Sequence, residues 1–208
     1  MPNRSPRKRG LFSALSACVL LLLATADLPA REAGPLTLPS RADAPAMLDT
    51  LSLCAVVCSF NFGSYADVIA ESGSDELFQL VQAYYQLALV STGAAAAVSE
   101  AVGEDRAALL EASYERGDAR LTEALEPLQE GGGDEAFAEF QTWNEARIAE
   151  CSGVLEDVGA ADHLEALMAL TGDMLPDVLP YMPDIYAYMR TFEDDSPEPG
   201  TELPESRD

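Results

Sequence analysis

The chain has 208 residues, of which 36 are acidic and 12 are basic, so its formal net charge at pH 7 is −24. Such a surface repels nucleic acids and anionic membranes, because both carry negative charge. We therefore expect no nucleic-acid partner. A saline environment, a cationic partner and simple solubility are three situations that suit this charge. The length is sufficient for one domain with its own hydrophobic core.

Residues 1–26 have the three parts of a secretory signal peptide. A basic segment ends at Arg9, an apolar segment runs from Leu11 to Ala24, and a small-residue site at Ala26 precedes Asp27. The apolar segment is shorter than the about 20 residues that span a bilayer. We predict cleavage after Ala26 and export, most simply to a bacterial periplasm or to the medium.

Two alternatives would leave the protein anchored to a membrane. The segment Leu15-Ser16-Ala17-Cys18 matches a bacterial lipobox, in which Cys18 would be lipidated, and an uncleaved N-terminal helix would also anchor the chain. The apolar run continues past Cys18, which favours simple cleavage. Cleavage removes four basic residues and no acidic one, so the charge becomes 8 − 36 = −28.

The elements that follow are predicted to be helical. Residues 27–43 contain three prolines and no apolar periodicity, which indicates a flexible tether. Asp43 is expected to cap a helix that runs to about residue 71. Apolar residues then recur at helical spacing in three further long segments. We expect these helices over about 75–100, 105–126 and 134–158, short ones over about 162–172 and 184–192, and a disordered acidic tail over 193–208.

Several signals set the expected helix ends. Ser74 resembles an N-cap, Pro127 and the following glycines should end the third helix, and Asp162 with Glu165 resembles a capping box. The segment 76–100 carries no internal charge, but its glutamines and hydroxyls make a buried helix more favourable than a membrane span. Four long amphipathic helices with short connections predict an all-α, antiparallel up-down four-helix bundle over residues 44–192.

The sequence excludes most catalytic and metal chemistry. His163 is the only histidine, whereas zinc, non-haem iron and di-iron bundle sites need several imidazole ligands. We expect His163 at the start of a short helix, in a surface role. Paired carboxylates are too abundant to indicate a catalytic pair. The sequence therefore predicts a non-catalytic protein without a cofactor.

Three cysteines remain after cleavage, and exported proteins commonly oxidise their thiols. Cys54 and Cys58 lie one turn apart on the first helix, and Cys151 lies on the core stripe of the fourth. In an up-down bundle the first helix ends at the same end at which the fourth begins. At a rise of about 1.5 Å per residue, Cys54 and Cys151 lie at about the same distance from that end. We predict a disulfide between Cys54 and Cys151, with Cys58 as the alternative partner.

A metal site is the alternative for the same cysteines. A Cys-x-x-x-Cys pair on a helix can hold Cu(I) between two sulfurs, and Cys151 would supply a third. The pair Cys54 and Cys58 resembles those of exported copper-storage four-helix bundles, which implies extracytoplasmic Cu(I) binding. Those bundles use many such pairs, whereas this chain has one.

The C-terminal segment 175–192 is rich in tyrosine, methionine and aliphatic residues despite its prolines. It is expected to fold back over the bundle, with presentation of a Tyr/Met surface to a partner as the alternative. Together these features predict an exported acidic binding module, with a cationic protein or an envelope component as the expected partner. The sequence leaves the oligomeric state open.

Overall fold

A computed structural model describes residues 36–72, 75–102, 106–185 and 187–188. The predicted signal peptide, the first part of the tether and the acidic tail lie outside these residues. The described elements are helical, without strands in the described ranges, as predicted. They are α2 (Ala44–Ser72), α3 (Asp75–Val102), α4 (Arg106–Gln129), α5 (Gly133–Asp157), the 3₁₀ helix η2 (Ala160–His163), α6 (Leu164–Val178) and η3 (Leu179–Tyr181).

Two helices form the centre of the fold. Residues 51–59 of α2 and residues 87–99 of α3 are buried without interruption. A helix buried over several consecutive turns must be covered on all sides, because successive residues point in different directions. Helices α3, α4 and α5 pack around α2, and helices α2, α4 and α6 pack around α3. This enclosure explains why both helices are apolar around most of their circumference.

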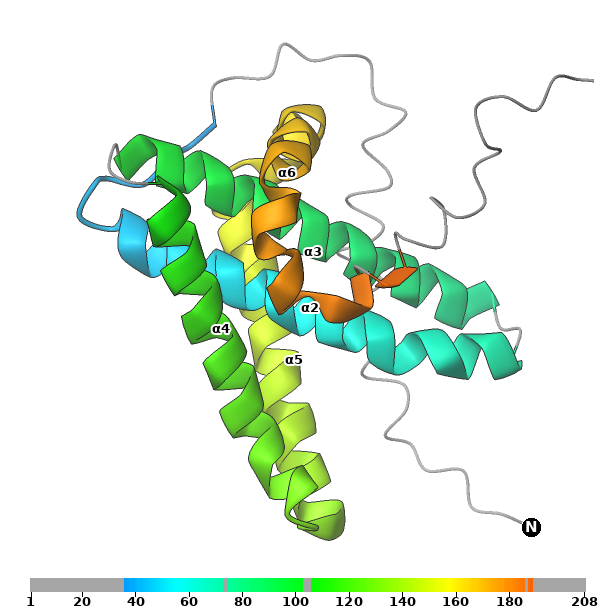
Figure 1. The fold of residues 1–208 in the computed structure, drawn as a ribbon. Coiled ribbons are helices and arrows are strands. Elements are labelled where there is room, and N and C mark those ends of the chain that lie inside the picture. Colours follow the sequence, from blue (N-terminus) through cyan, green and yellow to red (C-terminus); the bar gives the residue numbers. More distant parts are fainter. Residues whose placement is uncertain (1–35, 73–74, 103–105, 186, 189–208) are drawn as a thin grey trace, which may run out of the picture.

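The helices form two antiparallel pairs, α2 with α3 and α4 with α5. Figure 1 shows that the α4–α5 pair crosses α2 and extends away from it, instead of lying alongside the α2–α3 pair. Helix α6 crosses α3 on another side. The simple up-down four-helix bundle is therefore not confirmed. Since α3 has apolar residues on more than one face, it packs against α6 as well as α2.

Two predicted helix ends were wrong. Helix α4 continues through Pro127 to Gln129, because a proline in the last turn removes only one intrahelical donor. The chain then turns at Gly131, whose φ is +85°, and the Gly132 amide donates to the Pro127 carbonyl at 2.9 Å. Helix α6 passes through Gly172 to Val178, since its buried residues continue beyond the glycine as Met174, Leu175 and Val178.

The predicted caps also differ in detail. No side-chain hydrogen bond caps α6, which begins after His163, and Asp162 lies in η2. At the start of α2, the Asp43 carbonyl accepts from the Met47 amide at 3.2 Å, and its carboxylate accepts from the Ser40 hydroxyl at 2.5 Å. Ser74 lies outside the described residues.

The described part of the predicted tether contacts the folded domain. Leu36 packs against the core, and the Thr37 amide donates to the Val158 carbonyl at 3.3 Å. This contact joins the segment before α2 to the segment after α5. At Leu36 and Thr37, the segment before α2 is therefore in contact with the folded domain.

Buried polar groups connect the helices to one another. The Ser113 hydroxyl on α4 donates to the Ser52 hydroxyl on α2 at 2.6 Å, and Asn61 and Asn144 exchange two amide hydrogen bonds at 2.9 Å. The Thr92 and Tyr114 hydroxyls share a hydrogen bond at 2.8 Å, and the Thr171 hydroxyl donates to the Leu89 carbonyl at 2.7 Å. These bonds set the register between helices more sharply than apolar contacts alone, because an unpaired buried polar group is costly.

Within the described ranges, one helical segment, Ala44–Ala66, is long and apolar enough to cross a membrane. Sixty-seven per cent of its most apolar window is buried inside the protein. Its apolar character is therefore accounted for by its central position in the core.

Candidate functional site

The sulfurs of Cys54 and Cys151 lie 2.19 Å apart, and their Cα atoms are separated by 5.5 Å. This is the pair that the helix registers favoured. The disulfide joins α2 to α5 across 97 residues of sequence. Both cysteines are buried, so the cross-link lies inside the core and is shielded from solvent reductants. It stabilises the position of the α4–α5 hairpin on α2.

Cys58 is a buried free thiol on α2. Burial raises its pKa to about 12, so the neutral thiol is the favoured form. With Cys54 joined to Cys151, two of the three sulfurs of the Cu(I) alternative are engaged with each other. Across the residues that the structure describes, no group of three His, Cys, Asp or Glu side chains is placed to hold a metal ion. Cu(I) binding would therefore require prior reduction of the disulfide.

His163 ends η2 and precedes α6, where its side chain is partly exposed. No hydrogen bond from its side chain caps α6. This position agrees with the expected surface role.

A pocket of about 500 Å³ lies between α3, the end of α2, α6 and the segment that follows η3. Helix α3 supplies its largest wall. Among the described residues, the ten that line the pocket carry no charge; they are Phe62, Ala66, Phe78, Val81, Gln82, Tyr85, Gln86, Leu89, Met168 and Tyr188. The volume is in the range that small-molecule sites occupy.

The pocket has a buried floor and an exposed rim. Phe62, Val81 and Leu89 are at most 7 % exposed. Large apolar groups are exposed at the rim: Phe78 is 50 % exposed, Tyr188 38 % and Met168 37 %. Apolar rim residues are more typical of a binding site than of an ordinary solvated surface.

Three aromatic rings meet on one side of this pocket. The ring centroid of Phe62 lies 5.7 Å from that of Tyr85 and 5.1 Å from that of Tyr188. The Tyr85 and Tyr188 centroids are 5.6 Å apart, with the rings edge to face. Burial raises the pKa of Tyr85, which keeps its phenol neutral at physiological pH. The cluster therefore offers polarised rings without a formal charge.

Sequence reasoning did not identify this pocket. Phe78, Tyr85 and Leu89 follow one another at spacings of seven and four residues, which is a second apolar stripe on α3. The prediction treated the uncharged segment 76–100 as one buried helix and did not separate its faces. The uncharged stretch between Glu76 and Glu100 was the available signal, because it leaves two faces of one helix apolar.

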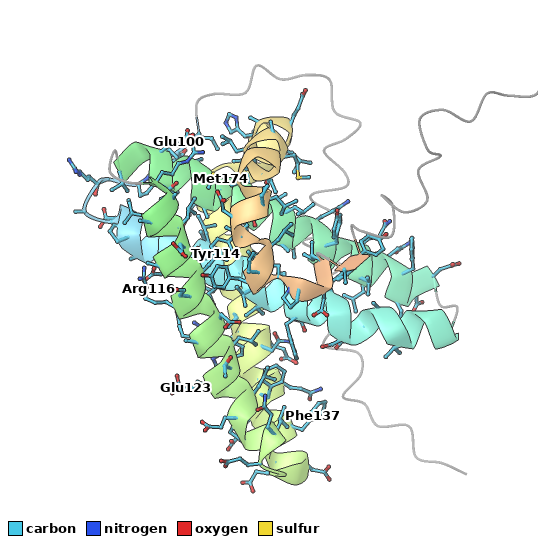
Figure 2. The ribbon with its side chains drawn as sticks, in the orientation of Figure 1. Glu100, Tyr114, Arg116, Glu123, Phe137 and Met174 are labelled. Carbon is cyan, nitrogen blue, oxygen red and sulfur yellow. A yellow bond between two sulfur atoms is a disulfide. The ribbon has the colours of Figure 1, made fainter. Side chains whose placement is uncertain are left out.

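The late methionines and aromatic residues have divided roles. Met174, Met182 and Ile185 are buried in the core, so the described part of the C-terminal segment folds back as expected. Met168 instead lines the pocket, and Met189 and Phe192 lie outside the described residues. Tyr181 packs on the buried Tyr114, with 5.8 Å between ring centroids. Figure 2 shows Tyr114 directed from α4 toward the end of α6.

Charged side chains gather on the α4–α5 hairpin, far from this pocket in sequence. Helix α5 alone carries seven acidic residues and one arginine. Figure 2 shows Glu123 and the exposed Phe137 on the outer half of the hairpin. Among the described residues, this acidic surface therefore lies on other elements than the pocket does.

Comparison with protein families, curated proteins and solved structures finds no match to this chain.

Proposed function

We propose that the chain is an exported, non-catalytic binding protein of the extracytoplasmic space, and that the pocket on α3 is its ligand site. The observation that carries this proposal is an uncharged aromatic pocket with an exposed apolar rim in a chain of charge −24. The exposed apolar side chains of Phe78, Tyr188 and Met168 gather around one pocket, and a contiguous apolar patch of this kind is typical of a ligand-binding groove. The acidity favours cationic partners, such as a cationic protein or an envelope component.

Two independent features support the proposed compartment. The N-terminus has a signal-peptide pattern, and disulfides persist mainly in oxidising compartments. Protein isolated from its native host should begin at Asp27 and should yield a peptide joining Cys54 to Cys151 without reduction. A lipid-modified Cys18 would instead place the protein on a membrane. Three free thiols would contradict the disulfide between Cys54 and Cys151 and would support Cu(I) binding.

Occupancy of the pocket is tested with Nile red, a neutral dye that fluoresces in apolar sites. The full chain should increase its fluorescence saturably. Met168→Glu should abolish this signal, because it places a charge on the rim of the apolar pocket. Phe137→Glu is the matched control, since Phe137 is similarly exposed on α5 outside the pocket, and it should leave binding unchanged. Equal binding by both variants would contradict the assignment of this pocket.

A further inference from the structure

We infer that the pocket binds a small organic cation with an apolar body, of the quaternary ammonium class. This inference rests on the proposed function and adds the ligand chemistry. Two physical features carry it: the aromatic cluster of Phe62, Tyr85 and Tyr188, and the net negative charge of the chain.

The aromatic cluster supplies the short-range attraction. The face of an aromatic ring is negative, so a cation within about 6 Å of a ring centroid is attracted, more strongly once it is desolvated. The three centroids lie between 5.1 and 5.7 Å from one another and the three residues line the same pocket, so a ligand in the pocket lies near more than one ring. The Met168 thioether adds a polarisable contact.

The charge of the protein supplies selectivity at longer range. A net charge of −24 raises the local concentration of cations and lowers that of anions.

The lining argues against other ligand classes. No charged side chain among the described lining residues is available to pair with a phosphate or carboxylate. The set of amides, rings and one thioether also lacks the anionic oxygens that Ca²⁺ and Mg²⁺ prefer. A quaternary ammonium needs neither hydrogen bonds nor a fixed counter-ion, and its methyl groups tolerate the apolar walls. The Gln82 and Gln86 amides provide hydrogen-bonding groups for a polar substituent on the ligand.

The test compares three probes of the same shape and different charge. These are choline, 3,3-dimethylbutan-1-ol, in which carbon replaces the nitrogen, and the anion 3,3-dimethylbutanoate. The full, disulfide-bonded chain carries ¹³C-methyl methionine, and sodium chloride holds the ionic strength constant. Choline should shift the Met168 methyl resonance saturably and bind about tenfold more tightly than the neutral alcohol. The anion should bind most weakly, and the buried Met182 resonance should not move.

Variants identify the rings that are responsible. Tyr188→Leu keeps the pocket apolar but removes one ring, so it should reduce the preference for choline over the alcohol several-fold. Phe137→Leu, which removes an exposed ring outside the pocket, should leave the preference unchanged. Circular dichroism checks that each variant is folded.

Two outcomes would overturn the inference. Equal affinity for the cation and its neutral isostere would show an apolar site without charge selectivity. An unchanged preference in Tyr188→Leu would show that this ring does not contribute. Either result can coexist with saturable Nile red binding, so a failure of the cation inference is distinguishable from a failure of the proposed binding function.

Discussion

The middle of the α2–α3 pair and the α4–α5 hairpin differ in how they are buried. Residues 87–99 of α3 are enclosed without interruption, whereas α5 buries separate positions such as Phe140, Ile148 and Leu155 along one stripe. A helix that is apolar on several faces lies at the centre, and a helix with one stripe lies at the periphery. Apolar positions that the centre leaves uncovered then become candidate binding surfaces.

The largest expected effect concerns the link between these regions. Cys151→Ala removes the disulfide that holds the hairpin to α2. It should lower the free energy of unfolding by up to about 4.7 kcal/mol, the chain-entropy value for a loop of about 100 residues. Guanidinium denaturation without reductant measures this loss.

Cys58→Ala is the matched control for that experiment. It removes a buried sulfur without opening the loop and should cost about 1 kcal/mol. Hydrogen exchange in Cys151→Ala should increase more in α4 and α5 than in α3, because the hairpin loses its covalent attachment. Uniform exchange across all four helices would show that hairpin and centre unfold together.

A second prediction perturbs the centre through Gly93, where α6 crosses α3. A Cβ atom there would overlap the Leu167 carbonyl and approach the Thr171 hydroxyl to 2.8 Å. Gly93→Val should therefore cost about 1–3 kcal/mol by overpacking. Gly153→Ala on α5 meets nothing within 4 Å and should stabilise by up to about 1 kcal/mol. Thermal melts of both variants compare the two regions, and a loss at Gly153 would contradict this contrast.

The third prediction uses pH. The Cys58 thiol has a pKa of about 12 in the folded protein against an ordinary value of 9.0. The unfolded chain therefore releases this proton first as pH rises. The contribution of the neutral Cys58 thiol to stability is therefore complete below about pH 9 and is lost between about pH 9 and 12. In that range the free energy of unfolding should fall by about 1.4 kcal/mol per pH unit.

Chemical denaturation between pH 8 and 10 isolates the thiol in this test. The pKa values of the buried Tyr84 and Tyr114 are also raised by desolvation, so these phenols add to the slope at higher pH. Cys58→Ala should flatten the curve between pH 9 and 10. A curve of the same slope in the variant would assign the dependence to other groups.

The smallest effects compare one buried and one exposed polar contact of α4. Tyr114→Phe removes the hydroxyl that bonds Thr92 and should cost about 1 kcal/mol, because Thr92 keeps its bond to the Ala88 carbonyl. Arg116→Ala breaks an ion pair with Asp49 whose side chains are 53 % and 38 % exposed, and should cost less than about 0.5 kcal/mol. Urea midpoints measure both, and a larger loss at Arg116 would reverse the expected order.

Much of the secondary structure was predictable because it depends on local periodicity. The start of α2 near Asp43 and the end of α5 near Gly159 follow from apolar spacing and from a glycine whose φ is +73°. The pairing of Cys54 with Cys151 followed from the rise per residue along two antiparallel helices. These features need little knowledge of how distant helices cross.

The crossing of the two hairpins and the pocket were not predictable in the same way. Both depend on which faces of α3 are covered by other helices. Periodicity in the sequence identifies an apolar face of a helix but does not identify the helix that packs against it. Gly93 permits the close approach of α6, but no local signal indicates that the partner is the Leu167 carbonyl. The pocket arises where α6 ceases to cover the second stripe of α3, and this limit is set by tertiary packing.

The position of the disulfide in the sequence also sets an order of events during synthesis. Cys54 emerges 97 residues before Cys151, so all of α2, α3 and α4 is made before the cross-link can close. During this interval Cys54 and Cys58 are thiols one helical turn apart, a separation along one helix that disfavours direct bonding between them. Oxidation to the native pair therefore requires that α5 has reached α2. The cross-link thus reports that α5 has packed on α2, and it can close before α6 is added to the core.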